Sequence, residues 1–199
     1  MSDHREAALP NHLLLEGLSN GSPTAARQFH LRYSARISRC VWRLLGTDHE
    51  HDDVVQQVYV NVLDSMNRIH NPEALDTWVD SVTVKTVRYE IRKRKVRRLL
   101  WGKPPQTSDD VVDCRDNSSA FKQSHIRKFY EILDSMPAND RIILSLRFLE
   151  GYSVGEIAVV GNYSMSTAKR RLKKAKSLFV KKVLQDFSLI SLVEECHAT

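Results

Sequence analysis

The stretch that decides the fold is residues 153–175, which read SVGEIAVVGNYSMSTAKRRLKKA. Ser153 can cap a short helix over Val154–Val160, and Glu156 stands at the third helical position, as in a capping box. A glycine–asparagine turn follows, and Ser164 then caps a second helix that becomes strongly basic. This order predicts a helix-turn-helix, whose second helix enters the major groove of DNA with polar residues toward the bases and basic residues toward phosphates.

The basic residues of the chain are concentrated in two segments. The 199 residues carry a formal charge of only +6, yet Lys85–Arg98 contains eight lysines and arginines against one acid, and Lys169–Lys182 contains eight and no acid. Two separate basic segments indicate two contacts with a polyanion, because each neutralised phosphate releases a counterion. A solvated helix face is the alternative for either segment by itself.

The fold class expected from the whole sequence is all-α, with two small helical domains joined by a flexible linker, the C-terminal one a helix-turn-helix. Glycine is scarce, at 7 of 199 residues, and no stretch alternates apolar and polar residues as a strand would. The segment after residue 101 has the prolines, serines and aspartates typical of a linker. The predicted boundaries are an N-terminal domain at 1–100, a linker at 101–122, a C-terminal domain at 123–185 and a tail at 186–199.

Caps, prolines and glycines predict where the helices begin and end. Ser22 and Pro23 suit the start of a helix that reaches Leu45, where Gly46 stops it. The apolar stripe predicted for this helix consists of Phe29, Tyr33, Ile37, Val41 and Leu44. Further helices are expected at Asn11–Leu18, from Asp48–Asp53 onward, at Pro72–Leu100, at Phe121–Leu133 and at Pro137–Leu149.

Several classes of protein do not fit the sequence. No apolar run approaches the ~20 residues that span a bilayer, and no signal peptide is visible, so no membrane insertion is expected. Cys40, Cys114 and Cys196 form neither a CxxC motif nor a disulfide framework, which favours a reducing, cytoplasmic location. His49 and His51 do not share a helix face, so no metal site is predicted. With no phosphate-binding glycine motif or catalytic grouping, the chain is expected to be no enzyme and to need no cofactor.

Several motifs of the chain, in their order, resemble the sigma-70 family of RNA polymerase sigma factors. The resemblance to the family's C-terminal domain, which binds the promoter −35 element, is carried by residues 133–137, 141–153, 156–158 and 164–175. Residues 53–59 are similar to its polymerase-binding helix, and residues 75–95 are similar to its −10-recognition helix. Two such domains, a short linker and no further module resemble the extracytoplasmic-function (ECF) type.

The resemblance implies a sigma factor that binds core RNA polymerase and directs promoter-specific initiation of transcription through the −10 and −35 elements. The implied partners are core RNA polymerase, promoter DNA and an anti-sigma factor. The residues implied at the polymerase contact are Asp52, Asp53, Gln56, Gln57 and Tyr59. A polar, acidic helix face bordered by valines suits such an interface, since charges guide orientation and apolar residues form the buried core.

The same resemblance implies two sets of DNA-binding residues. Those implied for the −35 element are Ser164, Ser166, Thr167, Lys169, Arg170, Arg171, Lys173 and Lys174. Those implied for the −10 element are His70, Asn71, Lys85, Arg88, Tyr89, Arg92 and Lys93. Trp78 either stacks on a flipped base or belongs to the core, and its spacing with Leu75 and Val82 favours the core.

Two other functions compete with this interpretation. A stand-alone helix-turn-helix transcriptional regulator would use residues 1–100 to bind a ligand or to dimerise, and it would bind duplex DNA tightly without polymerase. A nuclease or ligase would need clustered acids or a metal site beside the basic segments, and the sequence suggests no such cluster.

Overall fold

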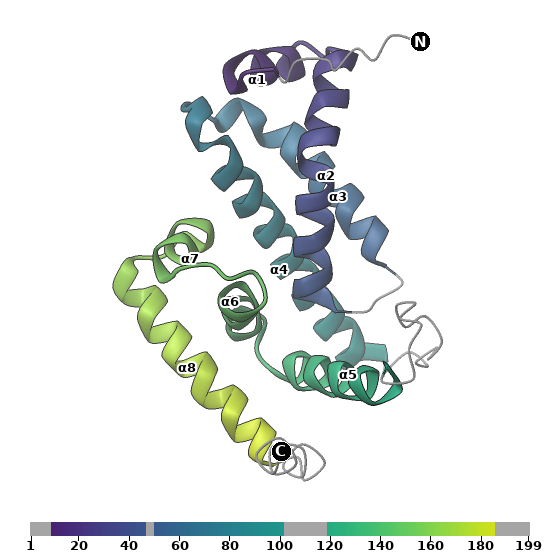
Figure 1. Cartoon of the computed structure of the whole chain (residues 1–199), viewed down its shortest axis with the longest axis vertical. Coiled ribbons are helices and arrows are strands. Elements are labelled where there is room, and N and C mark those ends of the chain that lie inside the picture. The colour runs from purple at the N-terminus through teal and green to yellow at the C-terminus, as the bar shows by residue number, and fades with distance from the viewer. Residues whose placement is uncertain (1–8, 47–49, 102–118, 186–199) are drawn as a thin grey trace.

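The computed structural model describes residues 9–46, 50–101 and 119–185, and the regular elements in these ranges are all helical. Eight α-helices and two short 3₁₀ helices follow one another there without a strand (Figure 1). The all-α prediction is therefore confirmed. The predicted tail, most of the predicted linker, His49, Cys114 and Cys196 lie outside the described residues.

The first two helices follow the caps that the sequence contains. α1 spans Asn11–Ser19, and α2 spans Pro23–Leu45 with proline at its first position. The Ser22 hydroxyl accepts a hydrogen bond from the Ala25 N–H at 3.4 Å, and Gly46 ends the helix with a φ of 74°. The apolar stripe predicted for α2 is buried throughout, which confirms that this face packs into the core.

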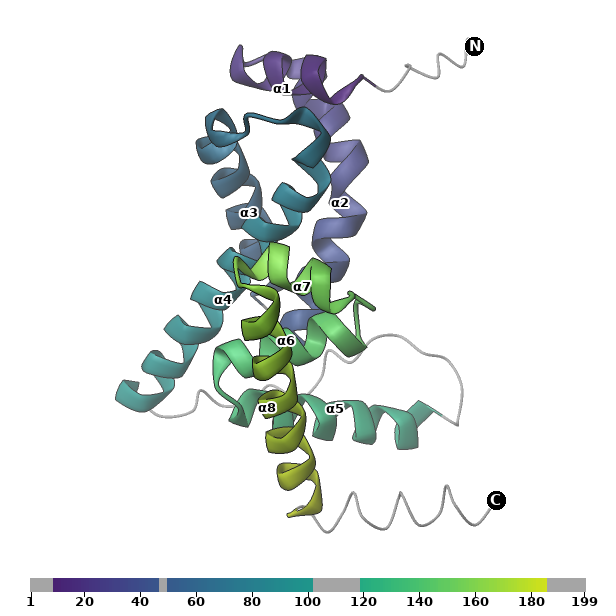
Figure 2. The same ribbon diagram turned by 90° about the vertical axis from the view of Figure 1, so that its left-hand side faces the viewer.

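The next helices are separated at a proline. α3 spans His51–Ser65, and the short 3₁₀ helices η1 (Met66–Arg68) and η2 (Pro72–Ala74) connect it to α4, which spans Leu75–Trp101. The break before α4 is the predicted one, because the residue before a proline avoids the α region. Figure 2 shows the C-terminal end of α4 projecting from the body of the molecule, and Trp101 at this end is 83% exposed.

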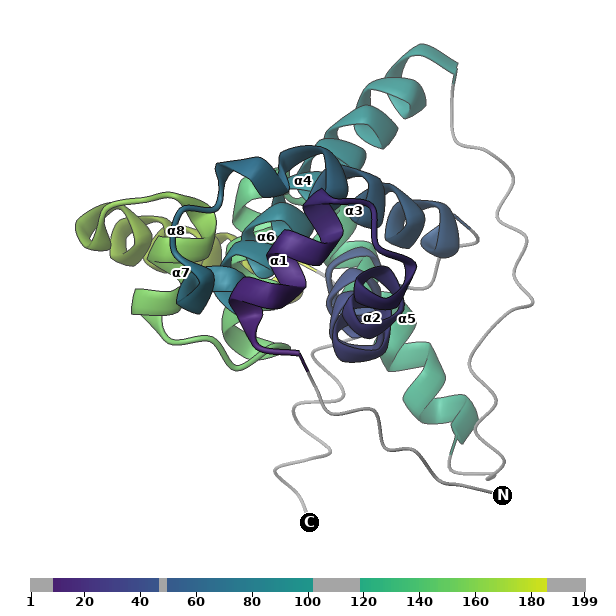
Figure 3. The same cartoon turned by 90° about the horizontal axis from the view of Figure 1, so that it is seen from above.

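The C-terminal half contains four helices. α5 spans Ser119–Ser135, α6 spans Ala138–Phe148, α7 spans Val154–Gly161 and α8 spans Met165–Leu184. Each helix predicted for this half is present, and α5 begins two residues earlier than expected, within the range predicted as linker. Seen from above, α7 and α8 lie together at one edge of the molecule (Figure 3).

The N-terminal half (α1–α4) and the C-terminal half (α5–α8) are docked on one another. Their buried apolar side chains, from Leu14 in α1 to Ala175 in α8, form one cluster that also includes Cys40. Across the boundary, α4 lies against α6 and α7, and α2 lies against α6. Because burial of apolar surface is the main favourable term in folding, this contact stabilises the arrangement of the two halves.

Candidate nucleic-acid interface

The first helix of the helix-turn-helix begins with the predicted capping box. The Ser153 hydroxyl accepts a hydrogen bond from the Glu156 N–H at 3.2 Å, and the Glu156 carboxylate accepts one from the Ser153 N–H at 2.7 Å. These hydrogen bonds lower the pKa of the Glu156 carboxyl. The two residues thus satisfy backbone donors that the first turn of α7 leaves unpaired.

The turn between α7 and α8 needs its glycine for close packing. Asn162 adopts the left-handed conformation, with a φ of 54°, and the Tyr163 N–H donates to the Ala158 carbonyl at 2.8 Å. The Tyr163 ring lies directly against Gly161, where an added Cβ would stand 2.5 Å from the ring. This contact fixes both the exit of α7 and the position of Tyr163.

The recognition helix α8 starts with a hydrogen-bonded polar turn. The Ser164 hydroxyl accepts from the Thr167 N–H at 3.2 Å and lies 3.0 Å from the Ser166 hydroxyl and 2.8 Å from the Thr167 hydroxyl. The Ser164 hydroxyl therefore caps the helix, and Ser166, which is also exposed, lies beside it without capping a backbone N–H. Of the two, Ser166 is the better placed to meet a base edge.

The two faces of α8 have opposite characters. Ala168, Leu172 and Ala175 are buried against the rest of the C-terminal half. The opposite, exposed face carries the implied DNA-binding residues Ser166, Lys169, Arg170, Lys173 and Lys174. Thr167 and Arg171 lie between the faces, and the Arg171 guanidinium stacks on the Tyr163 ring at 4.5 Å from its centroid.

Four of the eight basic residues in Lys85–Arg98 pair with acidic side chains of the described residues, and Lys93 does so with Glu90. Arg94 is buried and pairs with Glu90 and with Glu50, each at 3.2 Å. Arg97 also pairs with Glu50, at 3.0 Å, and Arg98 lies 3.4 Å from the Asp134 carboxylate. Several cations of α4 therefore bind the protein itself, so this segment offers less unpaired positive charge to a polyanion than its sequence suggests.

The basic segment of α8 carries far less internal compensation. Among the described residues, the structure shows one ion pair for this segment, from Lys174 to Asp140 at 3.8 Å. Most of the remaining lysines and arginines of Lys169–Lys182 are exposed on α8 and add positive charge to its surface. This surface therefore has the stronger electrostatic attraction for phosphates.

The residues implied for the −10 element lie in a loop and on α4. His70 and Asn71 are exposed in the loop before η2, where the Asn71 side-chain oxygen accepts from the Glu73 N–H at 3.0 Å. Lys85, Tyr89, Arg92 and Lys93 share one exposed face of α4, with Tyr89 68% exposed. Arg88 differs, because it is half-buried and its guanidinium lies 5.7 Å from the Tyr163 centroid. Burial lowers the pKa of Arg88.

Trp78 belongs to the margin of the core. It is partly buried and packs against the apolar cluster, next to the fully buried Leu75. The structure thus favours the core interpretation over a ring held out for stacking.

The residues implied at the polymerase contact are not equivalent. Asp52, Asp53, Gln56 and Gln57 are exposed on the first two turns of α3. Tyr59 instead turns toward α2, where its ring lies 5.4 Å from His30 and 6.1 Å from Phe29. Burial raises the pKa of the Tyr59 hydroxyl. Tyr59 therefore packs against α2, while the other four residues face outward.

A buried polar cluster between the two halves was missed in the sequence. Arg36 donates two hydrogen bonds to Asp80, at 2.8 and 2.5 Å, and the Tyr152 hydroxyl donates a third at 2.7 Å. Asp80 is only 5% exposed. The hydrogen bond to Asp80 raises the pKa of Arg36, and burial raises that of Tyr152. An aspartate within the apolar-periodic part of α4 was the available signal, since buried charges need partners.

Arg141 was also missed, and it joins α6 to the end of α2. Its Nε donates to the Leu44 carbonyl at 2.9 Å, and its Nη2 donates to the Leu45 carbonyl at 2.8 Å. Its Nη1 pairs with Asp134. Arg141 is 3% exposed, and burial lowers its pKa. A lone arginine in a basic protein gives no sequence signal for such a role.

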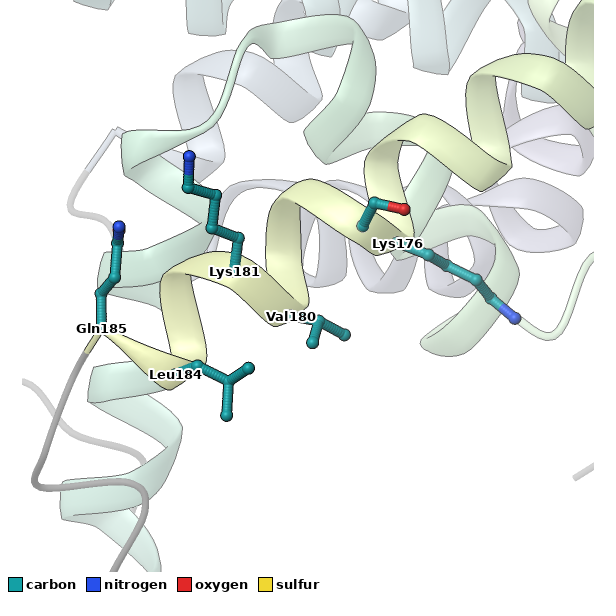
Figure 4. Close-up of a pocket in the computed structure, with 6 residues that line it drawn as sticks. Lys176, Val180, Lys181, Leu184 and Gln185 are labelled. Atoms are coloured by element: carbon teal, nitrogen blue, oxygen red, sulfur yellow. The ribbon is translucent and has the colours of Figure 1, made fainter.

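Other features of the described residues do not suggest a ligand site. No three His, Cys, Asp or Glu side chains in residues 9–46, 50–101 and 119–185 are grouped to hold a metal ion. An open groove of about 580 Å³ lies along the end of α8, and Figure 4 shows the side chains that line it. A single helix lines it, unlike the enclosed clefts that bind small molecules. In the described part of the chain, no helix is long and apolar enough to cross a membrane.

Two models of one protein family match the chain. The model of Sigma-70 region 2 matches residues 29–97, and the model of Sigma-70, region 4 matches residues 126–178, which contain the helix-turn-helix. Together the matches cover more than half of the chain. It belongs to the sigma-70 family. The region 2 match covers the part that the alternative of a stand-alone regulator assigns to ligand binding or dimerisation, so that alternative is not favoured.

Relatives place this sigma factor in the ECF type, and its family directs the initiation of transcription. It is 25% identical over 140 residues to ECF RNA polymerase sigma factor SigX of Bacillus subtilis (strain 168), over 69% of this chain and 72% of the relative. It is 22% identical over 189 residues to the ECF RNA polymerase sigma-E factor of Escherichia coli (strain K12), over 88% of this chain and 95% of the relative.

Two solved structures share the fold of this sigma factor. CnrH, in complex with the cytosolic domain of CnrY, aligns with a TM-score of 0.58 and 15% identity, over 89% of this chain and 99% of its own. The sigma factor RpoE of Bartonella quintana, in complex with the anti-sigma factor NepR, aligns with a TM-score of 0.52 and 15% identity, over 81% and 97%. At these identities the likeness concerns the fold alone.

Proposed function

We propose that this sigma factor binds core RNA polymerase through α3 and reads promoters with α8 and α4. In this proposal α8 holds the −35 element as duplex, and the loop before η2 together with α4 captures the opened −10 strand. Such a role would place the protein in the cytoplasm and would require binding, with no catalytic step and no cofactor.

The observation that carries the proposal is the exposed face of α8. Ser166, Lys169, Arg170 and Lys173 are exposed together at the start of a helix whose other face is buried in a helix-turn-helix. Hydroxyl and guanidinium groups at this position suit base edges in the major groove, and the lysines suit phosphates. Few basic side chains of this segment pair with acidic side chains of the protein itself, which supports the same assignment.

The surface of α3 supports a polymerase contact. Its exposed polar residues are followed on the same helix by Val60 and Leu63, two exposed apolar side chains. Apolar side chains bordered by polar ones suit a protein interface, whose buried core is apolar and whose rim is polar. The solved complexes with CnrY and NepR further support an anti-sigma factor as a second partner of this chain.

The experiment that tests the proposal is transcription by core polymerase from promoters mapped after overexpression. We expect promoter-specific transcripts only when this protein is added to core. Equal output with and without it, together with no binding to core, would show the proposal to be wrong.

Arg170→Ala tests the assignment of α8. In the holoenzyme, we expect it to weaken binding to the upstream element by about 1–3 kcal/mol if the side chain reads a base, or to lower the salt dependence by about one unit if it contacts phosphate. Lys181→Ala, on the last turns of the same helix, removes the same charge and serves as the control. Identical affinity and salt dependence for Arg170→Ala and the wild type would contradict the assignment.

A further inference from the structure

Helix α1 lies outside the residues that the model of Sigma-70 region 2 matches, and the function proposed above gives it no role. It nevertheless packs against both η1 and η2, across the end of the N-terminal half (Figure 2). Between these two short helices lie residues 69–71, called here the −10 loop, which include His70 and Asn71. The contacts of α1 therefore bear on how this loop is held.

Local hydrogen bonds join the −10 loop to the turns on either side of it. The Ile69 N–H donates to the Met66 carbonyl at 3.0 Å, and the Asn71 side chain accepts from the Glu73 N–H at 3.0 Å. His70 and Asn71 are exposed. Such a loop binds a nucleotide more tightly if it is held in shape beforehand, because it then loses less conformational freedom on binding.

Asn11, the first residue of α1, holds the η2 end of the loop. Its Nδ2 donates to the Pro72 carbonyl at 2.9 Å, and its Oδ1 accepts from Nη1 of Arg32 at 2.7 Å. Because an arginine side chain can only donate, Arg32 determines which side of the amide faces it. The NH₂ group of Asn11 is thereby directed toward Pro72.

Arg32 is in turn held by α4. Its Nη2 lies 3.4 Å from the Asp76 carboxylate, which also accepts a hydrogen bond from the Tyr33 hydroxyl at 2.6 Å. Burial raises the pKa of Tyr33, so the hydroxyl keeps the proton that it donates. A continuous set of polar contacts thus runs from the first turn of α4 through Arg32 and Asn11 to Pro72.

Ser19, the last residue of α1, lies at the η1 end of the loop. Its hydroxyl is 3.4 Å from Oδ1 of Asn67 and 3.6 Å from Sδ of Met66, and it can donate to either atom. The two ends of α1 therefore contact the two ends of the −10 loop.

Helix α1 is itself fixed to the N-terminal half. Leu14 and Leu18 are buried in the apolar core, and the Leu9 N–H, just before the helix, donates to the Gln28 side chain of α2 at 2.8 Å. Because the middle of the helix is anchored in this way, Asn11 and Ser19 stay at the separation that the helix imposes.

We propose that α1 is a positioning element for recognition of the −10 strand, in which Asn11 and Ser19 hold the −10 loop in the shape that receives an unstacked base. The inference rests on the role proposed above for this loop. Neither residue touches DNA, since each acts through η1 or η2. Without them the loop adopts other conformations, and the apparent affinity falls with the fraction of loops that are competent to bind.

Asn11→Asp tests the contact with Pro72. Aspartate keeps the acceptor for Arg32 but replaces the NH₂ donor with an oxygen that repels the Pro72 carbonyl. In the holoenzyme, we expect binding to a single-stranded oligonucleotide with a mapped −10 sequence to weaken about three- to tenfold, as for one lost hydrogen bond. We also expect weaker discrimination against a strand with one −10 base changed, and unaltered binding to a −35 duplex. His12→Ala, at the exposed neighbouring position, is the matched control and should leave all three unchanged.

A second pair of variants keeps the test decisive if Asn11→Asp folds poorly. We expect Ser19→Ala to show the same selective loss, and Ser19→Thr, which retains a hydroxyl, to behave like the wild type. Unchanged −10 affinity and base discrimination in a folded Asn11→Asp or Ser19→Ala variant would overturn the inference. An equal loss of −10 and −35 binding would also overturn it, because general destabilisation weakens both. Failure of the proposed function would differ, since the wild-type holoenzyme would then show no preference for the matched −10 strand.

Discussion

Two side chains, Ser153 and Glu156, satisfy backbone N–H groups that the first turn of α7 would otherwise leave unpaired. These hydrogen bonds join residues only three positions apart, so the spacing of a serine and a glutamate was enough to predict the capping box. The carboxylate form of Glu156 accepts the hydrogen bond, so the cap depends on the protonation of this residue.

Glu156→Gln is expected to make stability less dependent on pH. The folded state lowers the pKa of Glu156 below its ordinary value of 4.5. The carboxylate therefore stabilises the folded protein above about pH 4.5, and this contribution is lost as the pH falls through the lower, folded pKa. Glutamine keeps the capping geometry without the titration.

Thermal unfolding between pH 6 and pH 3 measures this effect. The melting temperature of Glu156→Gln should fall less over this range than that of the wild type. Ser153→Ala is the comparison, because it removes the serine cap and should lower stability by about 1 kcal/mol near neutral pH. Parallel pH profiles for the wild type and Glu156→Gln would contradict the role of the carboxylate.

At the scale of the element, α7 contains two glycines with different surroundings. An added Cβ at Gly155 would meet its nearest neighbour at 3.7 Å, an ordinary contact, whereas one at Gly161 would meet the Tyr163 ring at 2.5 Å. The first glycine is a helical residue without a packing role, and the second allows the turn to close.

The two alanine substitutions should therefore change stability in opposite directions. Gly155→Ala should stabilise the protein by up to about 1 kcal/mol, because alanine favours the helix. Gly161→Ala should destabilise it by about 1–3 kcal/mol, because the ring of Tyr163 must move. Urea unfolding of the two variants measures both effects, and equal midpoints would show that the ring contact does not constrain the turn.

The helices and their caps could be predicted from the sequence because their determinants are local, and the roles of the site residues stay predictions. The caps at Ser22, Ser153 and Ser164 act within three residues, and the apolar stripe of α2 repeats at the helical period. The roles of Asp80 and Arg141 could not be predicted, because the side chains that bind Asp80 and the α2 carbonyls that Arg141 binds lie 44 to 97 residues away. The ion pairs between Glu50 and the arginines of α4 were missed for the same reason, since a run of basic residues does not reveal acids that are distant in the sequence.

At the scale of the whole molecule, the shared core couples the two halves. Ile143 of α6 and Val87 of α4 both belong to the apolar cluster that extends through them. A domain pair with a small, polar contact would unfold in parts, whereas a continuous core favours one cooperative transition.

Ile143→Ala should lower the free energy of unfolding by about 2–5 kcal/mol, because it leaves a cavity in this core. Calorimetry should show a single transition for both the wild type and the variant. Val180→Ala, at an exposed position of α8, should change stability by less than about 0.5 kcal/mol. Two separate transitions, of which Ile143→Ala shifts only one, would show that the halves unfold independently.

Arg141 binds α2 through backbone carbonyl oxygens, so the contact constrains the amino acids on its two sides unequally during evolution. Every amino acid supplies a carbonyl, so positions 44 and 45 can change among apolar residues during evolution while the hydrogen bonds persist. Only the arginine itself must be retained, since lysine lacks the planar group that spans two acceptors. Covariation between alignment columns would therefore miss this contact, although it would register a side-chain pair such as Asp80 and Tyr152.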